Sequence, residues 1–339
     1  MHVAFCSFRL GGRDGVSVEV KKWQEAFAGL GWGLSTVAGS GAADRIIPSL
    51  ALDVDDSPDD RELESAFGGA DLVVVDNLCS IPLNPSAGRA VARVLRNRPA
   101  ILRHHDLYWQ HARWHRGGWE IPTDPEWRHV VISELSRKQM AERGIEATTA
   151  YNTFTAGPPG RRGATRKILG VADQETLLLH PARAIARKNV PAAVALAEAL
   201  GATYWLTGDA EMGYGPELET VLARARCRVI RLAVDDSADA YAACDAVLFP
   251  SSWEGFGNPP IEAALHRRPV AVGSYPVASE LIERFGFRWL PADDPKPLRE
   301  WLSDPDESVL DHNNRMARKH FSPESLRATL SDLLGKWGW

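Results

Sequence analysis

Two carboxylates stand close together in the segment from Pro250 to Ala263, PSSWEGFGNPPIEA. Glu254 follows a short apolar run, and Glu262 comes later with seven residues between the two. An ionised carboxylate only accepts hydrogen bonds, so such a pair is suited to holding the vicinal hydroxyls of a sugar and of a ribose. Glu262 alone would need no ligand, because a carboxylate near a helix N-terminus also compensates the helix dipole.

The residues between the two carboxylates favour a ligand site. Gly255 and Gly257 flank Phe256 and would let a ligand approach the backbone closely. Asn258 is suited to cap a helix that begins with two prolines, and we expect Glu262 in its first turn. The stretch therefore predicts a strand, a glycine loop and a helix N-terminus around a ligand that carries hydroxyl groups.

Up to three cations gather at another strand-to-helix corner, after the apolar run that ends at His180. Arg183 follows this run, and Arg187 and Lys188 precede the next predicted helix. Helix dipoles favour cations at C-termini, so cations at an N-terminal end indicate an anion between them, and a diphosphate would suit. We assign Arg183 and Lys188 to that anion and expect Arg187 to face solvent.

A third loop, Gly11-Gly12-Arg13-Asp14-Gly15, joins the first predicted strand to the first predicted helix. Its backbone N–H groups and the helix N-terminus could cradle a phosphate. The alternative is a tight turn that needs glycine for a positive φ. The loop lacks the GxGxxG spacing and the later acidic residue of a dinucleotide site, which argues against a nicotinamide-dependent oxidoreductase.

The sequence EGFGNPPIEA, with FPS before it and Arg183 and Lys188 well upstream, resembles the retaining nucleotide-sugar glycosyltransferases of family 4. The resemblance covers nearly the whole chain and is clearest over residues 176–285. It implies the GT-B fold, in which two Rossmann-like domains with mainly parallel sheets face each other across a cleft. It also implies transfer of a hexosyl group from a nucleoside-diphosphate sugar to an acceptor hydroxyl, with retention of configuration and without a metal or other cofactor.

The same resemblance implies roles for individual residues. Glu254 would contact hydroxyls of the donor sugar, and Glu262 the ribose of the nucleotide. The implied donor-binding residues are Gly11, Gly12, Arg183, Lys188, Glu254, Gly255, Phe256, Gly257 and Glu262, to which we add Gly208, because it leaves the carboxyl end of another predicted strand. The implied catalytic residues are His105, Arg183, Lys188 and Glu254, with His104 as the alternative to His105.

The implied chemistry is attack by the acceptor on the face of the sugar that the diphosphate leaves. Arg183 and Lys188 would stabilise the charge on the diphosphate, whose own oxygen would take the acceptor proton. On this assignment Glu254→Gln leaves the binding of free nucleoside diphosphate nearly unchanged, whereas Glu262→Ala weakens it.

Residues 104–127 are rich in aromatic and basic side chains. Aromatic faces stack on sugar rings and guanidinium groups hold anions, so we expect an acceptor-binding surface here and an acceptor that is partly anionic. The candidate residues are Trp109, Arg113, Trp114 and Arg116. The alternative is a folded cap with buried tryptophans.

Two other interpretations of these residues are weaker. A glycosidase with Glu254 and Glu262 on one helix would separate their Cα atoms by ~12 Å, beyond the carboxyl separations that hydrolysis uses. A non-catalytic subunit that binds nucleotide sugars would tolerate loss of His105 and of the cations, and this remains the alternative function. His105 and the cations are all present in this sequence, and their presence favours the enzyme over the non-catalytic subunit.

Metal binding is also disfavoured. Asp53 and Asp55 satisfy the DxD pattern of metal-dependent glycosyltransferases, but they lie in the acidic stretch 53–60, which is typical of a solvated loop. His111 and His115 are spaced for one helical face, yet no third ligand is apparent.

Strands and helices that alternate along the chain must position these loops. Strands are predicted at residues 2–8, 71–75, 100–103, 129–132, 176–180, 203–206, 228–232, 246–249 and 270–272. Amphipathic helices are predicted at residues 17–30, 86–96, 134–143, 190–200, 216–225, 237–243 and 259–266. This α/β alternation implies parallel, doubly wound sheets, whose ligands bind beyond the carboxyl ends of the strands.

A stretch rich in Gly, Pro and Arg, NTFTAGPPGRRGATR, interrupts the alternation and predicts a domain boundary. We expect an N-terminal acceptor-side domain at 1–152, a linker at 153–166 and a nucleotide-sugar-binding domain at 167–322. Residues 323–339 would form a C-terminal helix that crosses back to the N-terminal domain, as the resemblance implies.

Composition limits the remaining possibilities. The 339 residues are 45% hydrophobic and 24% charged with a net charge of -5, which excludes a disordered chain and offers no broad basic surface to nucleic acid. The cysteines, at positions 6, 79, 227 and 244, are far apart, and we expect all four to be reduced and buried in a cytoplasmic protein. We expect neither a transmembrane segment nor a signal peptide.

Overall fold

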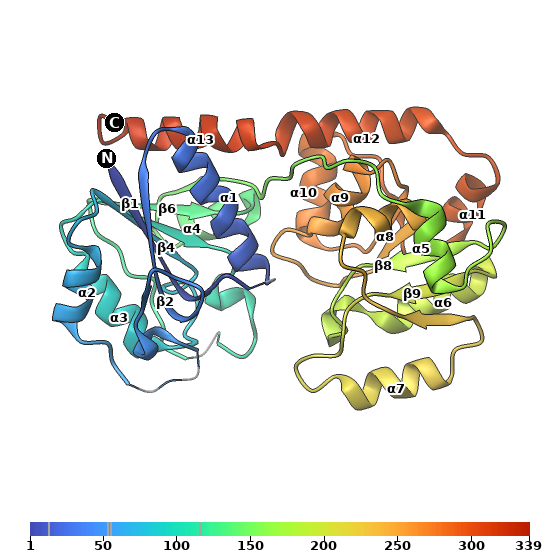
Figure 1. The fold of residues 1–339 in the computed structure, drawn as a ribbon, viewed down its shortest axis with the longest axis horizontal. Coiled ribbons are helices and arrows are strands. Elements are labelled where there is room, and N and C mark those ends of the chain that lie inside the picture. The colour runs from blue at the N-terminus through green and yellow to red at the C-terminus, as the bar shows by residue number, and fades with distance from the viewer. Residues whose placement is uncertain (13, 53, 55, 115–116) are drawn as a thin grey trace. The chain divides into compact units, whose positions relative to one another are not determined.

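The computed structural model describes residues 1–12, 14–52, 54, 56–114 and 117–339. These residues form two compact units, the first made of Met1–Thr153 with Pro323–Trp339 and the second of Phe154–Ser322. Each unit is an α/β structure with its own parallel sheet (Figure 1). The predicted fold class is therefore confirmed.

The described part of the first unit contains a seven-stranded parallel sheet. In spatial order its strands are β3 (Arg45–Ile46), β2 (Gly33–Gly41), β1 (His2–Leu10), β4 (Leu72–Asp76), β5 (Ala100–His104), β6 (Trp127–Val131) and β7 (Ala147–Thr149). The strand order reverses between the neighbouring strands β1 and β4. The carboxyl ends of these two strands are therefore the switch point of a doubly wound sheet.

Helices cover both faces of this sheet because its strands are apolar on both sides. One face packs against α1 (Gly15–Gly29) and α13 (Pro323–Gly335), through Trp23, Phe27 and Leu330 among others. The other face packs against α2 (Asp60–Phe67) and α3 (Pro85–Val94). Helix α4 (Glu134–Ala141) lies between β6 and β7 in the chain.

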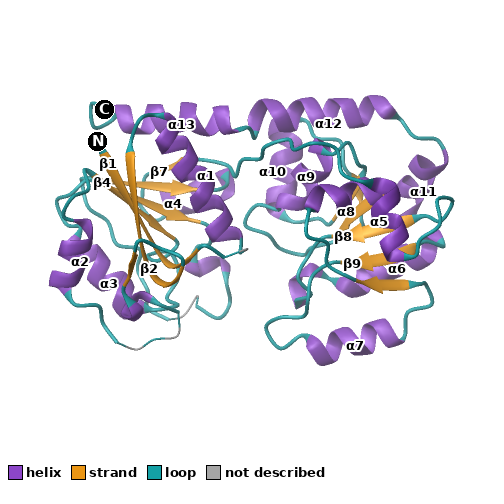
Figure 2. Cartoon of the chain, in the orientation of Figure 1, coloured by secondary structure: helices purple, strands orange, loops and turns teal. Residues whose placement is uncertain are grey.

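The second unit has a six-stranded parallel sheet with the same winding. Its strands are, in spatial order, β10 (Val229–Arg231), β9 (Thr203–Leu206), β8 (Leu177–His180), β11 (Ala246–Phe249), β12 (Val270–Val272) and β13 (Leu290–Pro291). Since β8 and β11 are neighbours, the loops that follow them leave the sheet side by side. Figure 2 shows the strands of each unit gathered together with helices running along them.

The helices of the second unit follow the predicted alternation and extend it. They are α5 (Arg162–Leu169), α6 (Val190–Leu200), α7 (Gly215–Ala223), α8 (Ser237–Ala243), α9 (Asn258–Leu265), α10 (Pro276–Phe285), α11 (Pro295–Ser303) and α12 (Glu307–His320). No helix among the described residues is both long enough and apolar enough to cross a membrane.

The predicted linker at 153–166 needs correction, because α5 begins inside it. Arg166 is buried and donates a hydrogen bond to the carbonyl of Ala243 at 2.9 Å, and Arg162 donates to the same carbonyl at 3.0 Å. These contacts tie α5 to the end of α8. The two arginines, which we took for part of a linker, are therefore what fastens this helix to the second unit.

The four cysteines are unpaired. Cys6, Cys79 and Cys244 are buried, and burial raises the pKa of the Cys79 and Cys244 thiols to about 12. Cys227 is only partly buried, so the expectation that all four are buried is wrong at this position.

Candidate active site

A carboxylate and two cations meet at the carboxyl end of the sheet in the second unit. The Lys188 ammonium donates to Oε1 of Glu254 at 2.5 Å, and the Arg187 guanidinium is paired with Oε2 of the same carboxylate. Arg187 also donates to the Trp253 carbonyl at 2.9 Å. The loop after β8 supplies the cations and the loop after β11 the carboxylate, so the order of strands in the sheet brings them together.

This cluster is largely shielded from water. Glu254 is 6% exposed and Lys188 is 8% exposed, and the Lys188 ammonium lies 4.6 Å from the centre of the Phe249 ring. Burial lowers the pKa of Lys188, while Glu254 opposes this shift. A buried cation with a single buried counter-ion is suited to receiving a second anion.

His180 at the end of β8 is a neutral neighbour of the cluster. Burial, and secondarily the Lys188 charge, lower its pKa to about 3. Its Nδ1 lies 2.8 Å from the Tyr204 hydroxyl, and its buried Nε2 has no partner among the described residues. An imidazole that stays neutral adds no positive charge beside Lys188.

The two arginines differ from the sequence prediction in their exposure and in their partners. Arg187, which we expected to face solvent, holds Glu254. The Arg183 side chain is 54% exposed and donates to Glu211 at 2.7 Å, so it lies outside the buried cluster. The signal for Arg187 was its position next to Lys188 in a tight turn, Ala186–Lys188, which turns both side chains toward the neighbouring loop.

Gly208 has a structural explanation. A Cβ at this position would lie 2.3 Å from the Ala182 carbonyl oxygen and 2.7 Å from the Arg183 Cα. Glycine is therefore required for the close approach of two chain segments next to Arg183, and donor binding by Gly208 stays a prediction.

The loop between the two glutamates is held by aromatic side chains. Gly257 has a φ of +99°, and a Cβ there would lie 2.2 Å from the Tyr275 hydroxyl. The Phe256 side chain is buried and stacks on Phe154 at 6.3 Å between ring centres. Phe256 is thus a core residue, and the candidates for contact with a ligand are its backbone and the backbones of Gly255 and Gly257.

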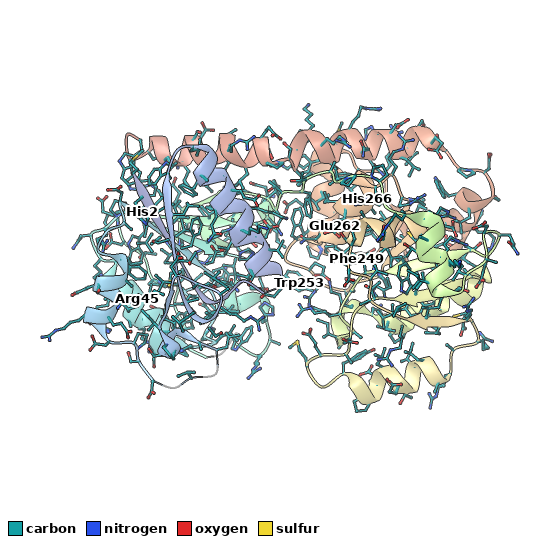
Figure 3. All side chains as sticks on the ribbon, in the orientation of Figure 1. His2, Arg45, Phe249, Trp253, Glu262 and His266 are labelled. Atoms are coloured by element: carbon teal, nitrogen blue, oxygen red, sulfur yellow. The ribbon has the colours of Figure 1, made fainter. Side chains whose placement is uncertain are left out.

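Glu262 has a partner that the sequence did not indicate. The Tyr241 hydroxyl donates to Oε2 of Glu262 at 2.5 Å, and the Tyr241 ring stacks on His266 with 5.0 Å between ring centres and 5° between planes. Burial and the Glu262 charge raise the pKa of Tyr241 well above its usual value. Figure 3 labels Glu262, which lies on α9, and His266, which caps the C-terminal end of this helix.

The start of α9 also differs from the prediction. Asn258 is the first helical residue, and Gly257, in the left-handed region, takes the N-cap position. No acidic residue lies in the first turn, so Glu262 belongs to the second turn. Compensation of the helix dipole at the N-terminus is accordingly a weaker explanation of Glu262 than its contact with Tyr241.

In the first unit the structure distinguishes between the two candidate histidines. His104 is fully buried: its Nδ1 lies 2.7 Å from the Ser80 hydroxyl and its Nε2 3.0 Å from Nδ1 of His129. Burial lowers the pKa of His104 well below its usual value and that of His129 to about 4. Both rings are therefore neutral core residues.

His105 has a different environment. Its Nε2 lies 2.9 Å from Oδ1 of Asp76, and its side chain is 8% exposed. Oδ1 of Asn77, a residue with φ of 58°, accepts hydrogen bonds from the backbone N–H groups of His105 and Asp106 at 3.1 and 3.2 Å. The loops after β4 and β5 thus hold His105 at the carboxyl end of the sheet, where ligands of such sheets bind.

The glycine loop of the first unit forms the tight turn that the sequence allowed as the alternative, and phosphate binding by Gly11 and Gly12 stays a prediction. Gly11 has a φ of +77°, and a Cβ there would lie 2.6 Å from the Ala42 Cβ, so the turn requires glycine. A cleft of about 530 Å³ lies beside it, lined by Gly11, Gly12 and Lys21 among others. The Asp14 carboxylate already caps α1, accepting from the Ser17 N–H at 3.1 Å.

The aromatic segment after β5 divides into exposed and buried parts. Trp119 and Trp127 are buried and donate to backbone carbonyls, which fits the alternative of a folded cap. Trp109 is partly exposed, with the Arg143 guanidinium 4.0 Å from the centre of its ring. Trp114 is also partly exposed, and exposed Arg113 lies 5.8 Å from its ring.

Some candidates fall outside the described residues. These are Arg116 of the acceptor surface, Asp53 and Asp55 of the DxD pattern, and His115. His111 lies 3.1 Å from Asp106. Within the described residues, no group of three or more His, Cys, Asp or Glu side chains could hold a metal ion.

Comparison with known proteins points in one direction. The family described as "Glycosyl transferases group 1" matches residues 183–302, which include Lys188, Glu254 and Glu262. The mannosylglucosylglycerate synthase of Thermotoga maritima is 22% identical over 427 aligned residues, covering 98% of this chain and 99% of that protein.

Solved structures agree at the level of the fold. HepE of Anabaena, in complex with UDP-glucose, superposes with a TM-score of 0.77 at 17% identity and covers 99% of this chain and 100% of its own. The sucrose-phosphate synthase of Thermosynechococcus elongatus gives a TM-score of 0.74 at 16% identity, covering 99% of this chain and 98% of its own.

Proposed function

The chain belongs to the group 1 glycosyltransferases of family 4, which have the GT-B fold and transfer hexosyl groups from nucleotide sugars; on this premise we propose which residues bind the substrates. The second unit binds the nucleoside-diphosphate sugar, and the first unit binds the acceptor. Configuration at the transferred sugar is retained, as the family assignment implies.

The observation that carries this proposal is the buried contact of Glu254 with Lys188 and Arg187. Two cations at the carboxyl end of a parallel sheet are suited to a diphosphate, and a carboxylate next to them is suited to sugar hydroxyls. Lys188 and Arg187 bind the diphosphate and stabilise the charge that develops on it as it leaves. Arg183 also binds the diphosphate, from the exposed side of the cluster. It can leave Glu211 for this purpose because a surface ion pair is weak and readily exchanged.

Glu262 binds the ribose of the donor. The hydrogen bond from Tyr241 occupies Oε2 and fixes the direction of the carboxylate. A carboxylate oriented before the ligand arrives loses less side-chain entropy on binding, which increases affinity. The backbone of residues 255–257 lies between this carboxylate and Glu254 in the chain and completes the donor site.

The reaction breaks the bond between the anomeric carbon and the diphosphate oxygen and forms one bond, from that carbon to the acceptor oxygen. The acceptor hydroxyl loses its proton to the departing diphosphate, so no covalent intermediate with the protein is required. Glu254 stabilises the positive charge that the sugar ring gains in the transition state. His105 contributes a hydrogen bond to a substrate hydroxyl from the first unit.

The acceptor is a hydroxyl compound that carries negative charge. The support is the combination of partly exposed Trp109 and Trp114 with Arg113 and Arg143, because aromatic rings stack on sugars and guanidinium groups bind anions. The name of the Thermotoga relative, a mannosylglucosylglycerate synthase, denotes a product that contains the anion glycerate.

A thermal-shift panel followed by a transfer assay tests this function. UDP sugars come first because HepE was solved with UDP-glucose, and GDP and ADP sugars follow. A true donor at 100 times its dissociation constant should stabilise the protein by ~2.7 kcal/mol, and Lys188→Ala should abolish the shift. Absence of any shift with all three sets of donors would contradict the proposal.

A further inference from the structure

Five charged or ionisable side chains form a continuous chain from the surface of α1 to His105. Lys22 contacts Glu19 at 2.5 Å, Glu19 contacts Arg103 at 3.2 Å, and Arg103 contacts Oδ1 of Asp76 at 3.2 Å. The same Oδ1 lies 2.9 Å from Nε2 of His105. The signs alternate along this chain, and Glu19, Arg103 and Asp76 are all buried.

The sheet explains why these groups meet. Asp76 of β4 and Arg103 of β5 are register partners, and His105 follows Arg103 by two residues. Side chains two apart in a strand point to the same face, and His105 directly follows the last residue of β5. Arg103 contacts Glu19 of α1, and His105 shares Oδ1 of Asp76 with Arg103, so both side chains lie on the face that α1 covers. His104 points to the opposite face together with His129, whose register partner is Leu102.

Oδ1 of Asp76 accepts a hydrogen bond from the Arg103 guanidinium at 3.2 Å, so this oxygen acts as an acceptor in the cluster. An ionised carboxylate only accepts hydrogen bonds, so Nε2 of His105 must carry the proton that it donates to Asp76. A neutral imidazole has one N–H group, and Nδ1 is then left as an acceptor. Among the described residues, no side chain or backbone group makes a hydrogen bond with Nδ1 of His105.

We propose that Asp76, held by Arg103, is a positioning residue that fixes His105 as the tautomer protonated at Nε2, so that Nδ1 accepts a hydrogen bond from a substrate hydroxyl. The contact with substrate rests on the proposed function, whereas the tautomer does not. His105 thereby recognises a hydroxyl that donates, and an analogue in which that hydroxyl is replaced by fluorine or hydrogen loses this contact.

The first test needs no variant of Asp76. Protein labelled with 15N at histidine is measured by long-range 1H–15N NMR at neutral pH, and the His105 signals are assigned by their absence in His105→Gln. We expect Nε2 of His105 to appear as a protonated nitrogen and Nδ1 as an unprotonated one. Protonation at Nδ1 only, or at both nitrogens, would overturn the proposal.

The second test separates positioning from folding. Asp76→Asn should lower kcat by about 10-fold to 100-fold, the range expected for a hydrogen bond to the reacting substrate, with little change in the binding of free nucleoside diphosphate. Asp76→Glu should recover part of this loss. The matched control is Ser80→Ala, which removes a buried hydrogen bond to His104 on the other face and should leave kcat within a factor of two.

The outcomes distinguish the proposal from the function on which it rests. An unchanged kcat in Asp76→Asn, or an equal loss in Ser80→Ala, would refute positioning by Asp76. Should Asp76→Asn fail to fold, the 15N spectrum of the parent protein still decides the tautomer. Full activity of His105→Gln together with the expected tautomer would refute the substrate contact of His105 and leave its tautomer assignment intact.

Discussion

Replacing Glu254 by Gln should tighten the binding of free nucleoside diphosphate and at the same time lower kcat. The family resemblance alone predicts nearly unchanged diphosphate binding, because the diphosphate has no sugar to present to Glu254. The structure changes this expectation, since Lys188 and Arg187 are both paired with Glu254 when no ligand is bound. An incoming diphosphate must share these cations with the carboxylate and is repelled by its charge.

The magnitude follows from the shielding of this contact. The Glu254 side chain is 7% exposed, so screening by water is weak. A hydrogen bond to a charged group contributes about 1.5 to 3 kcal/mol, and the cations recover only part of it elsewhere. We therefore expect a gain slightly below this range, about 1.4 kcal/mol, which corresponds to a roughly 10-fold lower Kd for the diphosphate.

Isothermal titration calorimetry with the nucleoside diphosphate of the identified donor measures this Kd directly. Glu211→Gln is the matched control, because it removes the exposed partner of Arg183 and should change the Kd by less than 3-fold. A weaker diphosphate complex of Glu254→Gln would mean that Glu254 supports the cations instead of competing for them. The competition between Glu254 and the diphosphate for Lys188 and Arg187 would then be refuted.

Four further predictions concern the rest of the molecule. Tyr241→Phe should raise the donor KM about 10-fold with kcat nearly unchanged, since it releases Glu262 without removing it, and steady-state kinetics checks this. Arg103→Met leaves Asp76 buried without its arginine and Glu19 with Lys22 alone, and should cost about 3 to 5 kcal/mol in urea unfolding, whereas loss of an exposed pair would cost under ~1 kcal/mol. Acidification should destabilise the protein between pH 6.5 and about 4, because the folded state keeps His129 neutral while the unfolded chain binds a proton. This group alone contributes a loss of at most about 3 kcal/mol. A series of thermal melts should show a smaller loss in His129→Asn, in which buried His104 and His180 still contribute. Transfer activity should persist in EDTA, and an activity that disappears and returns with Mg²⁺ or Mn²⁺ would contradict the proposed role of the cations.

Much of the fold could be predicted because buried parallel strands and amphipathic helices have clear periods. The predicted strand at 246–249 and helix at 190–200 have the bounds of β11 and α6. Strand β2 was missed because its sequence, GLSTVAGSG, has glycine and small polar residues in place of an apolar run. Helices α11 and α12 were missed because their faces are dominated by charged residues, and packing rather than local pattern stabilises them.

Predicting the candidate site was limited by contacts that join distant segments. The spacing of Glu254 and Glu262 was visible in the sequence, but the Tyr241 hydroxyl on Glu262 comes from another helix and had no local signal. Arg187 and Arg183 have the same residue type and both follow β8, so only the turn geometry reveals which one reaches Glu254.

The distinction between His104 and His105 could have been drawn from the sequence. Alternation along the predicted strand places Arg103 and His105 on one face and His104 with Leu102 on the other. The register that pairs Asp76 with Arg103 could not have been predicted from the sequence, because it depends on how two strands separated by a helix align. The buried charge chain that ends at His105 is therefore a result of the three-dimensional structure.

The central claim is that this chain transfers a hexosyl group from a nucleotide sugar with retention of configuration. A proton NMR time course with the donor found in the thermal-shift panel and a hydroxyl acceptor tests it most directly, because the anomeric proton reports the configuration of the first product before it can equilibrate. We predict a first product with the anomeric configuration of the donor, formed by the parent protein and lost in Lys188→Ala. The opposite anomer as first product, or the same product from Lys188→Ala at the parent rate, would contradict this account.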